Sequence, residues 1–190
     1  MVKELVYKNR SYRRFYESES IDRETLVELV DLARVSASGR NLQSLKYYIS
    51  NEKSLNDKIF QTLAWAGYLK EWAGPAEGER PSGYIVILED TTLGAAMAHD
   101  QGIASQSILL GAVEKGLGGC IIASVKKAEL SKILELPEHL SIALVLAIGK
   151  PKEEVIMVEM AEDGDVKYWR DEDGRHYVPK RKLEDVLINL

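Results

Sequence analysis

Cysteine and long apolar runs are what this chain most clearly lacks. Cys120 is the only cysteine, so the chain alone can build neither an intrachain disulfide nor a cysteine-based zinc site, and we expect no metal. No apolar run approaches the roughly 20 residues that a membrane-spanning helix needs. The opening residues, MVKELVYKNR, lack the uninterrupted apolar segment of a signal peptide. We therefore expect a cytoplasmic protein without a membrane partner.

Basic residues are in the minority. The chain has 25 Lys and Arg against 30 Asp and Glu, for a formal net charge of -5. Nucleic-acid binding usually needs a basic face that captures phosphates and releases counterions, so we expect no nucleic-acid partner. Any phosphate site must be local. Basic residues do gather in two short stretches, NRSYRRF at 9–15 and PKRKL at 179–183.

Common catalytic motifs are also missing. The sequence contains no GxxxxGK[ST], HExxH or GxSxG, and the glycine-rich GLGGC at 116–120 ends a predicted helix where a dinucleotide fingerprint would begin one. His99, His139 and His176 are scattered along the chain, so we expect structural or surface positions and assign them no catalytic role. EGER at 77–80 precedes a proline and is predicted to be a solvated turn.

A globular core is nevertheless well supported. With 190 residues, 45% of them hydrophobic, the chain can bury roughly 70% of its extended surface in one domain, residues 1–190. Helices and strands mix without a clean βαβ alternation, which indicates the α+β class. Periodicity and end signals predict helices at 2–9, 22–35, 52–63, 93–115 and 127–136, and strands at 45–50, 83–90, 118–124 and 141–149.

Several segments carry sharper local signals. Asp22 is the predicted N-cap of the helix at 22–35. The continuous apolar run within 83–90 predicts a strand buried on both faces. Small side chains on the helix at 93–115 would allow another helix to pack closely against it. They are Ala95, Ala96, Ala98, Gly102, Ala104, Gly111 and Ala112. From about residue 151 the chain is predicted to form a C-terminal hairpin and arm, with Asp173-Gly174 as the turn.

Three polar stretches favour a site for a phosphate-bearing cofactor. Arg10, Ser11 and Arg13 offer two fixed cations and a hydroxyl, groups suited to phosphate recognition. Lys180 and Lys182 share a face if their segment is extended. The third stretch, SASGRNLQS at 36–44, carries hydrogen-bonding side chains suited to a heteroaromatic ring, namely Ser38, Asn41 and Gln43. Each stretch alone is also typical of a solvated surface.

The order of these stretches resembles the nitroreductase family of FMN-dependent flavoproteins over nearly the whole chain. NRSYRRF is similar to the family's RRSxRxF, and Asn9 takes the place of the first arginine. The resemblance implies that Arg10, Ser11 and Arg13 hold the FMN phosphate and the pyrimidine edge of the flavin. It also implies a three-layer fold in which helices flank a mostly antiparallel central sheet.

Further motifs extend the resemblance. ASGRNLQS is similar to the family's PSxxNxQPW and keeps Ser38, Asn41 and Gln43; in the family this loop lies over the flavin held mainly by the other subunit. The resemblance thus implies a homodimer with the helix at 93–115 at its interface. It also implies that Ala123 and Ser124 approach flavin N5, and that Lys180 and Lys182 contact the FMN phosphate.

The implied activity is an NAD(P)H-dependent flavin oxidoreductase. In two steps, NAD(P)H gives a hydride to FMN N5 and a small acceptor, such as a nitroaromatic or a quinone, then takes the electrons. No side chain need be a nucleophile, and Arg13 is expected to stabilise negative charge near flavin N1 and O2. Within 64–80, the aromatic side chains Trp65, Tyr68 and Trp72 are expected to line the acceptor site, or alternatively to be core residues.

Two other functions stay open on the sequence alone. The chain could bind FMN, haem or a nucleotide without turnover, as a carrier or regulator. Alternatively, the arginine cluster could bind nucleic acid, which the acidic net charge disfavours.

Overall fold

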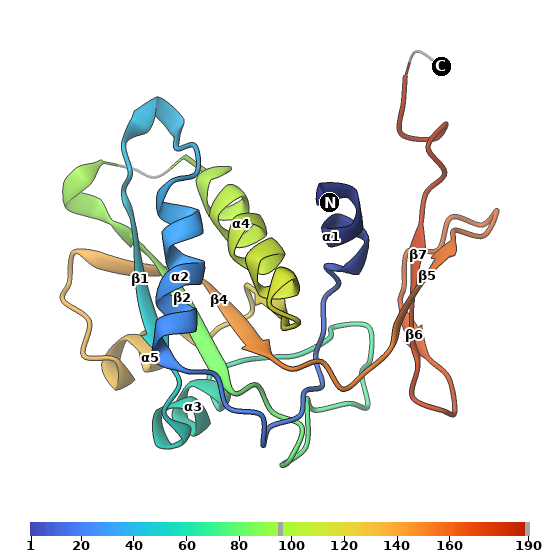
Figure 1. The fold of residues 1–190 in the computed structure, drawn as a ribbon, viewed down its shortest axis with the longest axis horizontal. Helices are drawn as coiled ribbons and strands as arrows, with labels where there is room; N and C mark the ends of the chain where they lie inside the picture. Colours follow the sequence, from blue (N-terminus) through green and yellow to red (C-terminus); the bar gives the residue numbers. More distant parts are fainter. Residues whose placement is uncertain (95–96, 189–190) are drawn as a thin grey trace.

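A four-stranded antiparallel sheet forms the centre of the protein. The computed structural model describes residues 1–94 and 97–188. The strands run β1-β2-β4-β3 across the sheet, and every neighbouring pair is antiparallel. Figure 1 shows the sheet behind two helices. The strands are β1 (Leu45–Ser50), β2 (Gly83–Asp90), β3 (Gly118–Ile122) and β4 (Leu140–Gly149).

Helices cover both faces of this sheet and complete three layers. One face packs against α2 (Arg23–Arg34) and α4 (Asp100–Glu114), and the other against α3 (Lys53–Phe60) and α5 (Lys127–Ile133). Strand β2 contributes side chains to both faces. Ile85 and Ile87 belong to the hydrophobic core between the sheet and helices α2 and α4, whereas Tyr84 and Val86 belong to the core on the side of α3 and α5. Because side chains alternate along a strand, an apolar run buries both faces. The predicted α+β fold is confirmed.

Helix α2 forms as its sequence predicts. The side chain of Asp22 accepts a hydrogen bond from the Thr25 backbone amide at 2.6 Å, which is the expected N-cap. Its apolar stripe packs on α4, where Gly111 takes part: a Cβ at Gly111 would collide with the Leu32 side chain. Gly111 therefore allows close contact between α4 and α2 within the chain, whereas a Cβ at Gly102 would meet no neighbour among the described residues within 4 Å.

The long helix predicted at 93–115 is wrong at its start. Helix α4 begins at Asp100, after a short 3-10 turn, Thr91–Leu93, and after Gly94, whose φ of 101° lies in the left-handed region. Ala95 and Ala96, which the prediction included, lie outside the described residues. The helix predicted at 127–136 ends early, at Ile133, because Glu135 has a φ of 50° and breaks it before Pro137.

The segment 64–80 is not helical. Across these residues, all of which the structure describes, the chain passes through successive turns. Ala66 at φ 40° and Gly74 at φ 120° interrupt any regular helix. Trp65, Tyr68 and Trp72 are spaced as on one face of a helix, but they do not lie on one. In the described ranges, moreover, every helix is too short or too polar to cross a bilayer.

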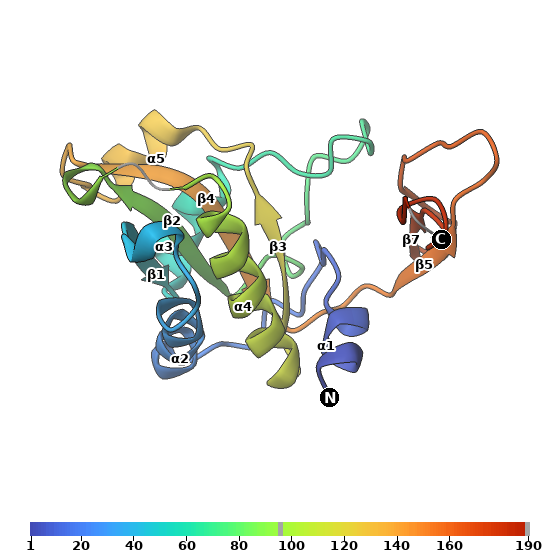
Figure 2. The same cartoon turned by 90° about the horizontal axis from the view of Figure 1, so that it is seen from above.

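The two ends of the chain stand beside the main domain (Figures 1 and 2). Helix α1 (Val2–Lys8) begins the chain, and the C-terminal arm contains β5 (Val155–Glu159), β6 (Trp169–Arg170) and β7 (His176–Lys180). Strands β6 and β7 form the predicted antiparallel hairpin, and Gly174 at φ 78° lies in its turn. Strand β5, which was not predicted, pairs with β7 in parallel.

Candidate functional site

The stretch NRSYRRF at 9–15, which we call the N-terminal motif, lies along the edge of the sheet. Ser11 forms an isolated parallel bridge with Gly119, and the Tyr12 amide donates to the Gly119 carbonyl at 3.0 Å. A Cβ at Gly118 would lie 2.5 Å from the Tyr12 ring and 2.8 Å from Pro151, so only glycine permits this approach. Gly118 of GLGGC thus allows the motif to pack closely against β3. This glycine serves packing within the chain, which agrees with the absence of a dinucleotide fingerprint.

A pocket of about 310 Å³ opens between this motif, α4 and the arm. Four of the predicted cofactor residues line it: Arg10, Ser11, Arg13 and Lys180. We call it the arginine pocket. Its remaining lining comprises Asn9, Gln106, Leu109, Ile121, Val155, Tyr168, His176 and Val178. Residues from the two ends of the chain therefore meet in one place, where the three cations form a positive surface.

Arg13 is held by the arm. Its Nη1 donates to the Ser11 carbonyl at 3.2 Å and lies 3.4 Å from Nε2 of His176, and its guanidinium lies 4.8 Å from the centre of the Tyr168 ring. Burial, together with the neighbouring Arg13 and Arg170 cations, lowers the pKa of His176 to about 4. His176 is therefore neutral at pH 7, and its Nε2 can accept a hydrogen bond from Arg13.

A buried carboxylate fastens the motif to the arm. The Glu153 side chain is fully buried and pairs with Nη2 of Arg170 at 2.8 Å. Its other oxygen accepts from the backbone amides of Arg13 and Arg14. Because a buried charge is tolerated only when it is paired and hydrogen-bonded, these contacts fix the backbone of the motif relative to β6.

Arg10 and Lys180 both contribute charge to the pocket. Nη2 of Arg10 donates to the Val6 carbonyl at 2.8 Å, and its Nη1 lies 3.0 Å from the Met157 sulfur. Its Nε is buried and has no hydrogen-bond partner among the described residues. Lys182 pairs instead with Glu159 at 3.2 Å and lines an adjacent hollow.

The Ser38 loop lies in a different part of the chain. Asp100, buried at the start of α4, accepts from Ser38 Oγ and from the Gly39 amide, both at 2.9 Å. The Ser38 hydroxyl in turn accepts from the Gln43 amide at 3.0 Å. Ser38 and Gln43 line a separate hollow of about 230 Å³, and Asn41 lies in the short 3-10 turn between them. Within one chain this loop does not share the arginine pocket.

Ala123 and Ser124 lie just beyond β3, where both are exposed. The Ser124 carbonyl accepts from the Ala64 amide at 2.9 Å. The β3 residue that lines the arginine pocket is Ile121. The predicted contact of Ala123 and Ser124 with a flavin stays a prediction.

The three aromatic residues of 64–80 have separate environments. Trp65 is buried in the core, with its ring centre 5.8 Å from that of Phe60, which is the alternative the sequence left open. Trp72 is partly buried against the same core, and its ring lies under the Arg170 guanidinium at 4.1 Å. Tyr68 is half exposed and makes an edge contact with Tyr168 at 5.0 Å. Tyr68 and Trp72 therefore join this segment to the arm, beside the arginine pocket.

Two aromatic residues that line the pocket were not predicted from the sequence to be part of the site. His176 and Tyr168 lie 5.1 Å apart between ring centres, and neither was assigned a role. A signal existed for His176: it shares a face of β7 with Val178 and Lys180, since residues two apart in a strand point the same way. Tyr168 precedes β6 and offered no comparable signal.

The prediction that Glu79 is solvated is also wrong. Residues 77–80 form the predicted turn, but the Glu79 side chain is not solvated. It accepts two hydrogen bonds from Arg14, of 2.7 and 2.6 Å, and pairs with Lys152 at 3.0 Å. These cations lower the pKa of Glu79 to about 2. The pair between Arg14 and Glu79 joins NRSYRRF to the turn at 77–80.

The donor set of the arginine pocket fits an anionic heteroaromatic cofactor. Three cations offer N–H groups, the unpartnered Nε of Arg10 is one of them, and Ser11 adds a hydroxyl. Fold and site together define an α+β protein with a pocket lined by three cations at the edge of its antiparallel sheet.

Comparison with known proteins gives the family. The profile of the Nitroreductase family matches residues 6–82 and 80–150. The chain therefore belongs to the nitroreductase family, whose members are flavin-dependent oxidoreductases.

Individual relatives are distant. The iodotyrosine deiodinase of Thermotoga neapolitana is 24% identical over 168 residues, covering 80% of this chain and 89% of the relative. The Cr(VI) reductase of Pseudomonas sp. strain G-1 is 26% identical over 163 residues, covering 80% and 67%. The structure of the NADPH:FMN oxidoreductase of Vibrio harveyi in complex with NAD+ has a TM-score of 0.63 at 22% identity, covering 79% of this chain and 68% of that one.

Proposed function

We propose that the protein is an FMN-dependent oxidoreductase that uses NAD(P)H to reduce a small, aromatic acceptor. The observation that carries the proposal is the convergence of Arg10, Ser11, Arg13 and Lys180 on one pocket, at positions that match the family's cofactor motifs. When bound, FMN supplies the hydride chemistry at N5, first from NAD(P)H and then to the acceptor. The protein supplies binding, orientation and electrostatics.

The cations of the pocket divide this work. Arg10 and Lys180 would hold the phosphate, since guanidinium and ammonium groups form strong charge-assisted hydrogen bonds with it. Arg13, fixed against His176 and Tyr168, would place a permanent positive charge beside the pyrimidine edge of the flavin. A charge held in place by the fold stabilises developing negative charge without reorganisation. Because His176 is neutral, it adds no positive charge beside the pyrimidine edge, and Arg13 would supply that charge.

A second copy of the chain is proposed to complete the site. The Ser38 loop, whose family counterpart lies over the partner's flavin, lines a hollow of its own. Apolar side chains are exposed on α1 and along the arm, as expected of surfaces that pack on a partner; they include Val2, Val6, Tyr7, Met157, Val166, Trp169 and Leu183. Sedimentation analysis is expected to give a dimer.

The acceptor is proposed to approach beside Tyr68 and Trp72, where 64–80 meets the arm. An aromatic acceptor would stack on these rings with favourable contact area. The distant relatives are named for acceptors as different as an iodotyrosine and chromate, so the proposal stops at the class of acceptor. If Trp72→Ala left the turnover of every aromatic acceptor unchanged, this part would be wrong.

Purification followed by anaerobic reduction tests the proposal. The protein should carry, or be reconstituted with, one FMN per chain, and NADH or NADPH should bleach its yellow spectrum. A colourless protein that FMN cannot reconstitute would overturn the proposal. A yellow protein that neither nucleotide reduces would favour the alternative, a flavin-binding protein without turnover.

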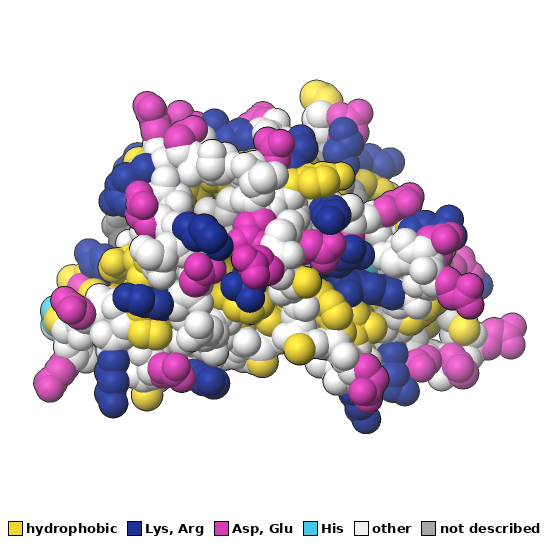
Figure 3. Space-filling view, turned by 90° about the horizontal axis from the view of Figure 1, so that it is seen from below, with side chains coloured by type: hydrophobic (Ala, Val, Ile, Leu, Met, Phe, Trp, Pro, Cys, Tyr) yellow, Lys and Arg dark blue, Asp and Glu magenta, His cyan; other side chains and the backbone are white. Residues whose placement is uncertain are grey.

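Nucleic-acid binding is not proposed. On the face shown in Figure 3, Lys and Arg side chains are interspersed with Asp and Glu, whereas nucleic-acid binding favours a continuous basic surface. A steep loss of affinity for generic DNA with rising salt would reinstate this function.

A further inference from the structure

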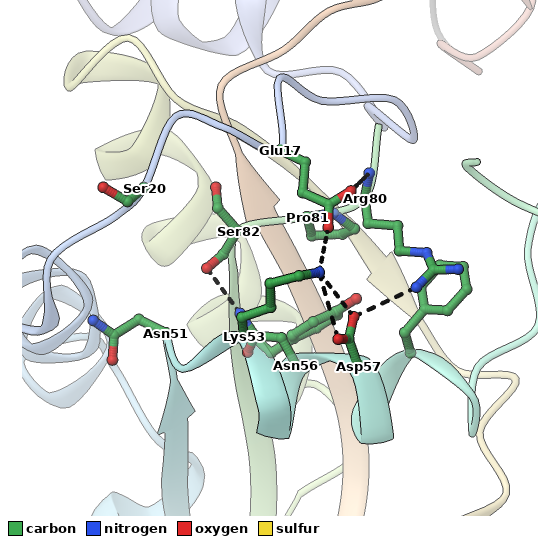
Figure 4. A pocket seen from close by; sticks show the side chains of 11 residues that line it. Glu17, Ser20, Asn51, Lys53, Asn56, Asp57, Arg80, Pro81 and Ser82 are labelled. Atoms are coloured by element: carbon green, nitrogen blue, oxygen red, sulfur yellow. Dashed lines mark hydrogen bonds and ion pairs between the residues drawn. The ribbon is translucent and has the colours of Figure 1, made fainter. Parts of the chain in front are cut away.

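A second pocket, of about 110 Å³, lies where β2 begins, away from the arginine pocket. Tyr84 of strand β2 is among the residues that line it. Lys53 and Asp57 of helix α3 lie on one side, facing Glu17 and Arg80 on the other (Figure 4). Its lining shares no residue with the arginine pocket. We call it the tyrosine pocket.

Three buried polar atoms of this pocket have no hydrogen-bond partner among the described residues. They are Oη of Tyr84, Oγ of Ser82 and Nε of Arg80. Tyr84 is fully buried and Ser82 is 8% exposed. Burial also raises the pKa of Tyr84, so its hydroxyl keeps its proton. Leaving such groups unpaired is costly, and three in one pocket indicate that something else satisfies them.

The ionic groups of the pocket already neutralise one another. Lys53 Nζ lies 3.0 Å from Glu17 Oε1 and 3.4 Å from an Asp57 oxygen, and Arg80 Nη1 lies 3.4 Å from Asp57 (Figure 4). Glu17 also accepts from two backbone amides. Two carboxylates thus balance two cations. An anionic ligand would meet the carboxylates, and a cationic ligand would meet Lys53 and the N–H of Arg80.

We propose that the tyrosine pocket binds a small neutral molecule that carries an amide or hydroxyl groups. Such a ligand could accept from Arg80 Nε and exchange hydrogen bonds with the hydroxyls of Tyr84 and Ser82. Its apolar part would rest on Pro81, because the Arg80 guanidinium already lies over the Phe60 ring, 4.4 Å from its centre. Each of these contacts satisfies a group that is otherwise unpaired. The proposal does not depend on the flavin or on the reductase activity.

Acetamide and acetate are matched probes for this site, because they share shape and size and differ in charge. The full-length protein is titrated with each while the backbone amide resonances of Gly78, Arg80 and Ser82 are followed by NMR. Acetamide should shift these resonances in a saturable way and acetate should not. Tyr84→Phe, which removes only the hydroxyl, should weaken acetamide binding by about tenfold. Tyr48→Phe, on the neighbouring strand β1, should leave it unchanged.

Three results would overturn the proposal. If acetamide leaves the three resonances unmoved, the pocket holds only solvent, which can satisfy polar groups equally well. If acetate binds as tightly as acetamide, the site is not selective for neutral molecules. If Tyr84→Phe binds acetamide as the unaltered protein does, the hydroxyl is not a ligand contact. The melting temperature of each variant, measured alongside, shows whether a loss of binding reflects unfolding.

Discussion

Nη1 of Arg13 lies 3.4 Å from Nε2 of His176, although 163 positions separate the two residues in the sequence. The arm thereby sets the position of a side chain in the N-terminal motif. Because arginine only donates hydrogen bonds, Nε2 must accept, and the proton of the neutral ring lies on Nδ1. Nδ1 is buried and has no hydrogen-bond partner among the described residues.

Replacing His176 should weaken cofactor binding. In His176→Phe the ring remains but Arg13 loses its acceptor, so we expect FMN affinity to fall by about tenfold, the effect of one lost hydrogen bond to a charged group. His176→Gln restores an acceptor and should lose less. Quenching of flavin fluorescence measures the affinity, and His139→Gln, at an exposed position, is the control. Equal affinity in His176→Phe and the unaltered protein would show that the contact does not position Arg13.

The same histidine should make stability depend on pH. Its pKa is about 4 in the folded protein and about 6.5 when unfolded. The unfolded state therefore takes up the proton first, so stability is full above pH 6.5 and falls as the pH drops toward 4. The loss should be on the order of 3 kcal/mol. Urea unfolding at several pH values should show this slope in the unaltered protein and a shallower one in His176→Gln.

The two lysines of PKRKL should not be equivalent. Lys180 lines the arginine pocket, whereas Lys182 pairs with Glu159 at 3.2 Å beside it. If Lys180 holds the phosphate, Lys180→Ala should lower FMN affinity by about tenfold, and Lys182→Ala, an exposed ion pair, should change it little. Binding of riboflavin, which lacks the phosphate, should be the same in both variants. The reverse order of FMN affinities would assign the phosphate contact to Lys182.

Asp100 should matter to both stability and cofactor binding. It accepts from Ser38 Oγ and the Gly39 amide, and its exposed fraction is 2%. Asp100→Ala leaves those two donors unpaired, which should lower the free energy of unfolding by about 2 kcal/mol. If the Ser38 loop covers the flavin of a second copy, FMN affinity should fall as well. Glu114→Gln, exposed at the other end of α4, is the control for both measurements.

Local patterns predicted most of the fold. The apolar run of β2 and the capped stripe of α2 depend on neighbouring residues, and both formed as expected. The start of α4 was misjudged because alanine and methionine at 95–98 favour a helix, while the positive φ of Gly94 depends on how the chain turns after β2. Strand β5 was missed because its partner, β7, follows it by about twenty residues and pairs in parallel.

The residues of the candidate site likewise fall into those that the local sequence predicts and those that depend on distant contacts. Arg10, Ser11, Arg13 and Lys180 carry a motif and could be named, whereas His176 and Glu153 act through contacts with residues more than a hundred positions away. Charge composition could suggest that Glu79 was solvated but could not reveal that Arg14 lies beside it. Residue type and spacing therefore pointed to charged residues that line the pocket more readily than to the groups that position them.

The pair between Arg14 and Glu79 should produce a separate acid dependence. Arg14 and Lys152 lower the pKa of Glu79 to about 2, against 4.5 in the absence of these contacts. Since the folded state holds the proton less tightly than the unfolded state, the stabilisation is complete above about pH 4.5 and is lost as the pH falls toward 2. Glu79→Gln should lower the free energy of unfolding at pH 7 by about 3 kcal/mol, and the difference should shrink toward pH 2. Urea unfolding measures both, with exposed Glu77→Gln as the control. An equal effect of Glu79→Gln at pH 7 and pH 2 would show that the cost comes from packing and not from the charge of Glu79.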